Sequence, residues 1–264
     1  MTAQNEDTAK AVTALKQQIQ GSGGFFFIDR TADETVRGEL AGMLGPFAVH
    51  RGLQVLDLSD PAADSTFNPL ANGQPGEVAE RLLAVLPAAD GNPQAQALLE
   101  QTSRAVTAIV EVLATIDRPY SMASLTALMS TPVQLLDLAN TLPASHPQAR
   151  SFHALLEEVK DPSGKGLISA ERLKGKVGGL VGRLSQLSGS SYWEILSNQA
   201  TDIDLTRVLA RGGGVYCRIP SYKQGSLREC MLEMALLQIV SNHEKLSKPP
   251  AFLITSTSGT VMPL

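Results

Sequence analysis

One short segment constrains the fold of this chain more than any other. Phe25-Phe26-Phe27-Ile28-Asp29 is an apolar run without alternation of polar and apolar residues. Such a run is typical of a strand covered on both faces, as the strands of parallel sheets are. Leu53–Leu58 predicts a second strand, and apolar residues at helical spacing predict helices over 6–20 and 33–45. Helix, strand, helix and strand in this order predict an α/β fold with a parallel sheet.

A long helical region then interrupts this pattern. Between residues 76 and 190 the sequence contains no convincing strand, and Pro- and Gly-rich breaks separate its apolar stripes. Helices are predicted over 76–86, 94–116, 121–128, 132–139, 147–159 and 169–188. The α/β pattern resumes with a helical turn at 204–209, a strand at 215–220, a helix at 225–242 and a strand at 251–255. We therefore expect α/β parts at 1–75 and 191–264 and an all-helical inserted domain at 76–190. The segments around Phe26, Val55 and Val215 should then lie in one sheet.

Composition excludes several classes of protein. The chain has 264 residues with 22 basic and 26 acidic side chains, so it is not a strongly basic nucleic-acid binder as a whole. Cys217 and Cys230 cannot build a disulfide framework or a four-cysteine zinc site, and both are expected to fill core space. The four histidines lack metal-ligand spacing, and we expect no metal site. No apolar run reaches the roughly 18 residues of a membrane span, so we expect a cytoplasmic protein.

Three stretches of the sequence, taken in order, carry a family resemblance. They are Gly23–Asp33, Ser65–Leu70 with its Phe-Asn-Pro-Leu element, and Leu209–Pro220. Together they resemble the ATPase domain of type IV secretion coupling proteins, the TraD/TraG, TrbC and DotL/IcmO relatives. The positions that match the motifs of this family are Asp29, Asp33, Asn68, Pro69 and Arg218.

The resemblance implies an incomplete RecA-like (P-loop NTPase-type) parallel sheet with an inserted all-α domain. In such proteins the motor forms hexamers at the cytoplasmic face of the inner membrane and uses ATP and magnesium to export DNA or protein. The helical domain helps to choose the substrate. The implied partners are other subunits of the secretion or conjugation machine, a relaxosome or effector protein, DNA, and further copies of the chain.

Departures from the family pattern concern its catalytic parts. A P-loop needs Gly-x-x-x-x-Gly-Lys-Ser/Thr. The segment that stands in the place of this loop, Met1–Asp7, holds no glycine and two acids. The strand at Phe252–Ile254 is followed by Thr255–Ser258, where the family has the acidic residues that hold magnesium. Thr31 replaces the family's lysine. We therefore assign no catalytic or nucleotide-binding residue, and we expect no cofactor for this chain and no ATP hydrolysis by it alone.

Two sets of charged residues allow two interpretations each. Asp29 and Asp33 form either a polar site of an intact motor or a strand end and a helix N-cap, and the second is favoured. The candidates for contact with DNA phosphates or an acidic partner are Lys160, Lys165, Arg172, Lys174, Lys176 and Arg183. The alternative is a solvated helix face with ordinary charge pairs, since acidic residues lie among them. Ser163–Gly166 is expected to be an interhelical turn.

The sequence thus predicts a coupling-protein-like component of a conjugation or type IV secretion machine that recruits its substrate or partner through the helical domain. Two rival functions stay open. One is an active DNA-translocating ATPase subunit of which this chain is a fragment, and nucleotide-stimulated turnover would support it. The other is a pseudo-ATPase that assembles with an intact homologue, and co-purification without nucleotide binding would favour it.

Overall fold

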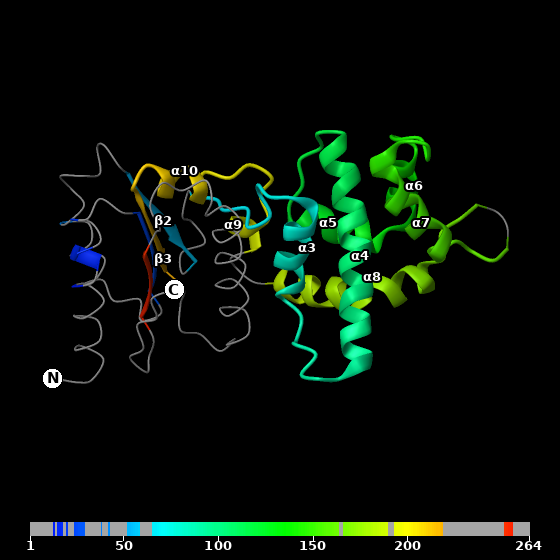
Figure 1. Ribbon diagram of the computed structural model, residues 1–264, viewed down its shortest axis with the longest axis horizontal. Helices are drawn as coiled ribbons and strands as arrows, with labels where there is room; N and C mark the ends of the chain where they lie inside the picture. The colour runs from blue at the N-terminus through cyan, green and yellow to red at the C-terminus, as the bar shows by residue number, and fades with distance from the viewer. Residues whose placement is uncertain are drawn as a thin grey trace. The chain divides into compact units, whose positions relative to one another are not determined.

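The computed structural model describes residues 24–29, 52–58, 65–163, 166–189 and 193–218, the backbone of 251–255, and single residues at 13, 15–17, 20, 38 and 42 (Figure 1). These single residues are helical. The helix predicted at 225–242 lies outside the described residues. The described residues divide into two compact units, one holding those up to Phe67 and from Ala200 onward, the other holding Asn68–Gln199.

The first unit contains a four-stranded sheet in which every pair of neighbouring strands is parallel. The strands are β1 (Phe25–Asp29), β2 (Leu53–Asp57), β3 (Gly214–Arg218) and β4 (Ala251–Thr255), in the spatial order β2-β3-β1-β4. Every residue of β1 is buried, as its apolar run predicts for an inner strand. Phe26 is aligned with Val215, and Val55 with Tyr216, so the predicted neighbourhood of these segments is confirmed. The fold is α/β with a parallel sheet, as the sequence predicts.

Aromatic side chains join β1 to β3. Phe25 is the register partner of Gly214, and a Cβ atom at Gly214 would lie 2.0 Å from the Phe25 ring. The Phe25 ring therefore occupies the space that any larger residue at position 214 would need. Two residues further along the same strands, the rings of Phe27 and Tyr216 stack with centroids 5.9 Å apart. These contacts fix the register of the two strands and with it the alignment of their ends.

The second unit is all-helical. Its helices are α3 (Pro75–Leu83), α4 (Pro93–Thr115), α5 (Met122–Ser130), α6 (Pro132–Ala139), the 3₁₀ helix η1 (Pro147–Ala149), α7 (Arg150–Val159), α8 (Ala170–Leu187) and α9 (Trp193–Leu196). In Figure 1 α8 runs across the long helix α4, and the two helices are in contact. The helices predicted for this region are present. Within its described residues the unit holds one isolated bridge, Lys160 to Ile168, and no strand.

Three helical predictions need correction at their boundaries. The helix predicted at 76–86 ends at Leu83, because Val85 and Leu86 turn back onto carbonyls three residues earlier before Pro87. The helix predicted at 147–159 is divided into η1 and α7. The helical turn predicted at 204–209 is α10 (Leu205–Ala210), capped by Asp204, and α9 was not predicted.

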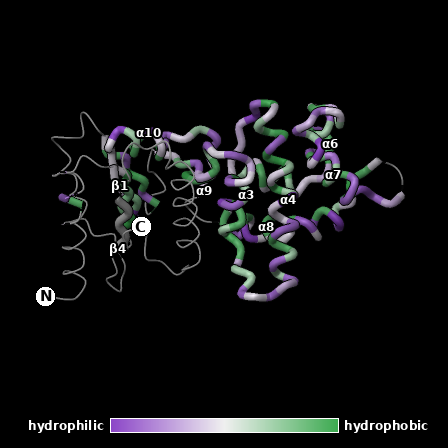
Figure 2. Tube along the Cα trace, viewed as in Figure 1, coloured by the Kyte–Doolittle hydropathy of each residue, from purple (hydrophilic) through white to green (hydrophobic). Residues whose placement is uncertain are grey.

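Local capping and amphipathic faces explain why these segments are helical. Asn92 accepts hydrogen bonds from Gln94 and Ala95 at the start of α4, and Ser169 accepts from Arg172 at the start of α8. One face of α4 is buried, with Val106, Ile109, Val110 and Leu113 among its members. Figure 2 shows hydrophilic and hydrophobic residues interspersed along the helices of this unit. None of the helices in the described ranges combines the length and apolar character needed to cross a bilayer.

The two segments that connect the sheet to the helical unit are bonded to each other, at a place we call the Thr66–Asp202 clamp. The backbone N–H and the hydroxyl of Thr66 donate to Asp202 Oδ2 at 2.8 and 2.6 Å. In return, the N–H groups of Asp202 and Ile203 donate to the Thr66 carbonyl at 3.1 and 3.2 Å. The donors of Thr66 lower the pKa of Asp202. The chain therefore leaves for the helical residues and returns from them at neighbouring points.

Candidate functional site at the carboxyl ends of the strands

The last residues of the strands form a row across the sheet. In register and in spatial order they are Asp57, Arg218, Asp29 and Thr255. Ligands of open α/β sheets bind beyond the carboxyl ends of the strands, so this row marks the first place to look for a site. The structure brings together two of the family-motif positions here, Asp29 and Arg218. Asp33 lies outside the described residues.

Asp29 is engaged by a residue that the sequence did not single out. The hydroxyl of Tyr216 donates to Asp29 Oδ2 at 2.6 Å, and the Asp29 side chain is fully buried. Burial, helped by this hydrogen bond, raises the pKa of Tyr216, so its hydroxyl remains a proton donor. The contact satisfies a buried carboxylate, and this is what a structural strand end requires.

Asp57 is engaged by Arg218, from the middle of the row. A guanidinium nitrogen of Arg218 lies 3.4 Å from Asp57 Oδ2, and the two side chains are 17% and 10% exposed. Cys217, the neighbour of Arg218, has a buried thiol whose pKa is raised by burial and then by the charges of Asp57 and Asp29. A thiol in this state is not an activated nucleophile, so the prediction that Cys217 fills core space is confirmed. Cys230 lies outside the described residues.

The two described carboxylates of this row are both engaged by protein side chains, whereas the magnesium–nucleotide group that the family resemblance implies needs carboxylates that can reach it. A magnesium ion needs carboxylate oxygens that can reach it from the protein surface and share it with phosphate. Asp29 is fully buried and accepts a hydrogen bond from Tyr216, and Asp57 is buried and paired with Arg218. The carboxylates of Asp29 and Asp57 are therefore engaged by Tyr216 and Arg218, whereas a metal site would present carboxylates that are free to bind an ion.

The family-motif residues Asn68 and Pro69 lie at the beginning of the helical unit, where they form a turn. The side-chain amide of Asn68 donates to the Tyr120 carbonyl at 2.9 Å, and its Oδ1 accepts from the Leu70 N–H at 3.0 Å. Asn68, Pro69 and Leu70 are all buried. These bonds tie the segment before α3 to the loop before α5. The Phe-Asn-Pro-Leu element therefore positions helices within this unit.

A buried arginine in the same region was not identified from the sequence. Arg81 on α3 is 0% exposed, and its guanidinium donates to the carbonyl of Asn72. Burial lowers the pKa of Arg81, and the charges of Tyr120 and Glu77 oppose this effect. Its position between Val78 and Leu82 on the apolar face of α3 was the signal for burial.

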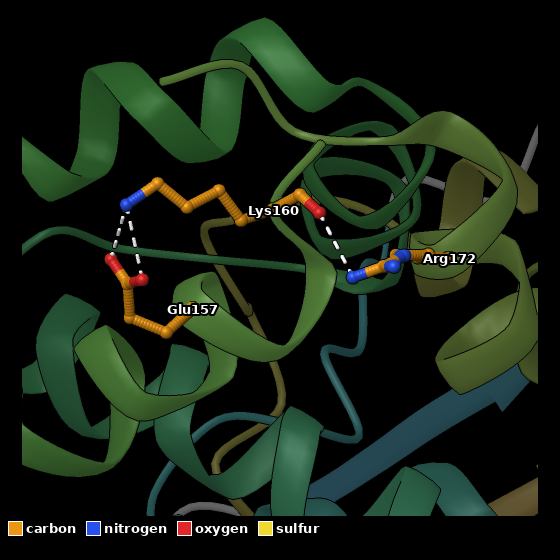
Figure 3. Close-up of polar contacts among 3 residues, drawn as sticks. All are labelled: Glu157, Lys160 and Arg172. Carbon is orange, nitrogen blue, oxygen red and sulfur yellow. Dashed lines mark hydrogen bonds and ion pairs between the residues drawn. The ribbon is translucent and has the colours of Figure 1, made fainter. Parts of the chain in front are cut away.

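Four of the predicted basic contact residues make hydrogen bonds or ion pairs within the helical unit. Figure 3 shows the ammonium of Lys160 facing both carboxylate oxygens of Glu157, at 2.9 and 3.0 Å, and its carbonyl facing Arg172, at 3.1 Å. Lys176 lies 2.5 Å from Glu158. Arg183 donates to the Val85 carbonyl at 3.2 Å, and Lys174 is an exposed residue of α8. Lys165 lies outside the described residues. Contact of these residues with DNA or an acidic partner stays a prediction.

Comparison with known proteins gives structural similarity without sequence similarity. No protein-family model and no curated protein matches the sequence. Among solved structures, the bacterial conjugative coupling protein TrwBdeltaN70 in an unbound monoclinic form is similar at 12% identity with a TM-score of 0.48. The plasmid coupling protein TrwB in complex with ADP and Mg²⁺ is similar at 13% identity with a TM-score of 0.47. The alignments cover 87% and 88% of this chain, which spans 54% and 55% of those chains.

Proposed function

We propose that this chain is a coupling-protein-like component of a conjugation or type IV secretion machine, and that its helical unit recruits a protein or DNA–protein substrate. The observation that carries the proposal is the helical unit itself, inserted along the chain between β2 and β3 of a parallel α/β sheet. Two of the three sequence stretches that resemble coupling proteins belong to the α/β parts, and the third, Ser65–Leu70, spans the beginning of this insertion. The proposal places the chain at the cytoplasmic face of the inner membrane, with further copies of itself or other subunits of the machine as partners.

The second part of the proposal is that the chain does not hydrolyse nucleotide alone. Two observations support it. The sequence contains no Gly-x-x-x-x-Gly-Lys-Ser/Thr. The carboxylates at the strand ends, Asp29 and Asp57, are paired with Tyr216 and Arg218.

The alternative role of a pseudo-ATPase that assembles with an intact homologue has one observation in its favour. Strands β2 and β4 are the two edge strands of the described sheet, and a further strand from a partner can pair with an edge strand. Co-purification of the chain with such a homologue, in the absence of nucleotide binding, would favour this role over that of a substrate adaptor.

A genetic experiment tests the proposed function. The coding sequence is deleted in its own host, and the transfer frequency of a conjugative element and the export of a reporter effector are measured. We expect at least one of them to fall and to recover when the full chain is supplied again. Unchanged transfer and export would overturn the proposal. Titration with a fluorescent ATP analogue tests the second part, since tight magnesium-dependent binding by the full chain would contradict it.

A further inference from the structure

A groove of about 430 Å³ lies within the helical unit, between α3 with the turn that follows it and the first half of α4. Along α4 the lining residues Gln96, Leu99, Glu100 and Ser103 follow the spacing of one helix face. Glu80, Leu83 and Ala84 line the groove from α3 at the same kind of spacing. The groove is therefore the surface between two helix faces.

The charged residues that line this groove are all acidic. Its apolar lining includes Leu83, Leu86 and Leu99, all half-buried. Its charged lining consists of the exposed carboxylates of Glu80 and Glu100, and no lining residue is basic. The Gln96 side chain donates to Glu100 at 3.0 Å, which holds one carboxylate in position. A largely apolar lining whose only charged groups are carboxylates suits a ligand that has both an apolar surface and positive charges.

A second groove of the same unit shows the contrast. About 360 Å³ in volume, it lies among α4, α7 and α8, and both signs of charge line it. Of these charges, Lys176 and Glu158 are already paired at 2.5 Å. A lining with both signs of charge does not favour one sign of charge in a partner, whereas a lining whose charges are Glu80 and Glu100 favours a positive partner.

We infer that the α3–α4 groove docks an amphipathic helical segment of a partner protein, with its apolar residues against the three leucines and its Lys or Arg side chains beside Glu80 and Glu100. A helix laid into a groove between helices is a common mode of peptide recognition. The volume admits a few side chains, so the partner contributes one helix face. The inference rests on the proposed function in one respect, since an adaptor needs a docking surface for what it recruits.

The test uses the full chain and a labelled synthetic helix of 18 residues made of Leu, Ala and Lys, followed by fluorescence anisotropy. The matched probe carries Glu in place of every Lys. We expect the basic helix to bind, with affinity that falls as salt is added, and the acidic helix not to bind. In the E80Q/E100Q variant, binding of the basic helix should weaken about fivefold, since each exposed ion pair contributes on the order of 0.5 kcal/mol.

A control variant and a second measurement locate the binding. The E171Q/E194Q variant removes two exposed carboxylates that do not line the groove, and it should bind like the unmodified chain. Methyl NMR should show shifts at Leu83, Leu86 and Leu99, with Leu155 of the second groove unchanged.

Three results would each overturn the inference: no binding of the basic helix, equal weakening in both variants, or methyl shifts confined to Leu155. Any of them leaves the proposed function standing, because that is decided by transfer and export in the host. Conversely, groove binding together with unchanged transfer and export would overturn the proposed function and leave the inference about the groove in place.

Discussion

The hydroxyl of Tyr216 donates to the carboxylate of Asp29 across two neighbouring strands, and both side chains are buried. The two residues are 187 positions apart in the sequence, so the contact exists only when β1 and β3 lie side by side in the correct register. Loss of this hydrogen bond would therefore indicate that β1 and β3 are no longer paired in the native register.

Removing the hydroxyl with Tyr216→Phe should lower the free energy of unfolding by about 1–3 kcal/mol, because Asp29 stays buried and loses this donor. The ring and its stacking on Phe27 remain, so the loss reports the hydrogen bond. Urea unfolding of the full chain, followed by circular dichroism, measures it. A change below about 0.5 kcal/mol, the range of ordinary surface substitutions, would contradict the assigned role.

The contact between Phe25 and Gly214 should make Gly214→Ala destabilising. The added methyl group would meet the Phe25 ring, and overpacking of this kind costs about 1–3 kcal/mol. Phe25→Leu removes the ring, so the double variant should lose less stability than the sum of the two single variants. A double-mutant cycle in urea measures this coupling, and strictly additive losses would show that the ring is not the obstacle.

Replacing glycines inside α8 should stabilise the protein, in contrast to the replacement of Gly214. A Cβ atom at Gly175, Gly179 or Gly182 would meet no other atom within 4 Å. Replacing each with Ala should raise stability by about 0.5–1 kcal/mol, because Ala loses less backbone freedom in a helix. Gly178→Ala is the matched control, since its Cβ would lie 2.8 Å from Lys174 Cγ, and its gain should be smaller. Thermal unfolding at 222 nm compares the variants, and equal gains at all four positions would contradict the steric argument.

Acidification should weaken the Thr66–Asp202 clamp. Because the pKa of Asp202 is lowered in the folded chain, the folded state holds the proton less readily than the unfolded state. The stabilising effect is present above the unfolded pKa of about 3.9 and is lost as the pH falls through the lower folded pKa. In Thr66→Val the hydroxyl donor is gone, and the pKa of Asp202 should rise toward its ordinary value.

Carbon-13 NMR of the carboxyl groups measures this titration. Asp161 is the internal control, because its pKa is lowered by hydrogen bonds from Ser163 and should not respond to Thr66→Val. An unchanged Asp202 midpoint, or an equal shift at Asp161, would show that Thr66 is not the cause.

Local pattern was sufficient for most of the described fold. The apolar run of β1 predicts a buried parallel strand, and apolar residues at helical spacing predict the helices. The placement of Asp29 and Asp57 at strand ends also follows from the sequence. Their pairing with Tyr216 and Arg218 does not, because it depends on the register of strands that are far apart along the chain.

The same distinction explains the charged residues of the helical unit. Lys160 and Glu157 are three residues apart on adjacent turns, so their pairing can be predicted from spacing. Lys176 and Glu158 are 18 residues apart and pair through the packing of α7 against α8. Burial of Arg81 likewise depends on the Asn72 carbonyl, which the turn before α3 supplies.

The Thr66–Asp202 clamp shows how a helical module can be inserted into the α/β chain. Since Thr66 and Asp202 are within hydrogen-bonding distance, the break in the α/β chain is no wider than a tight turn. Recombination at these two positions can graft a different helical module, or a simple hairpin, onto the same sheet without stretching it. One helical module can thus be exchanged for another without a change in the strands that carry it.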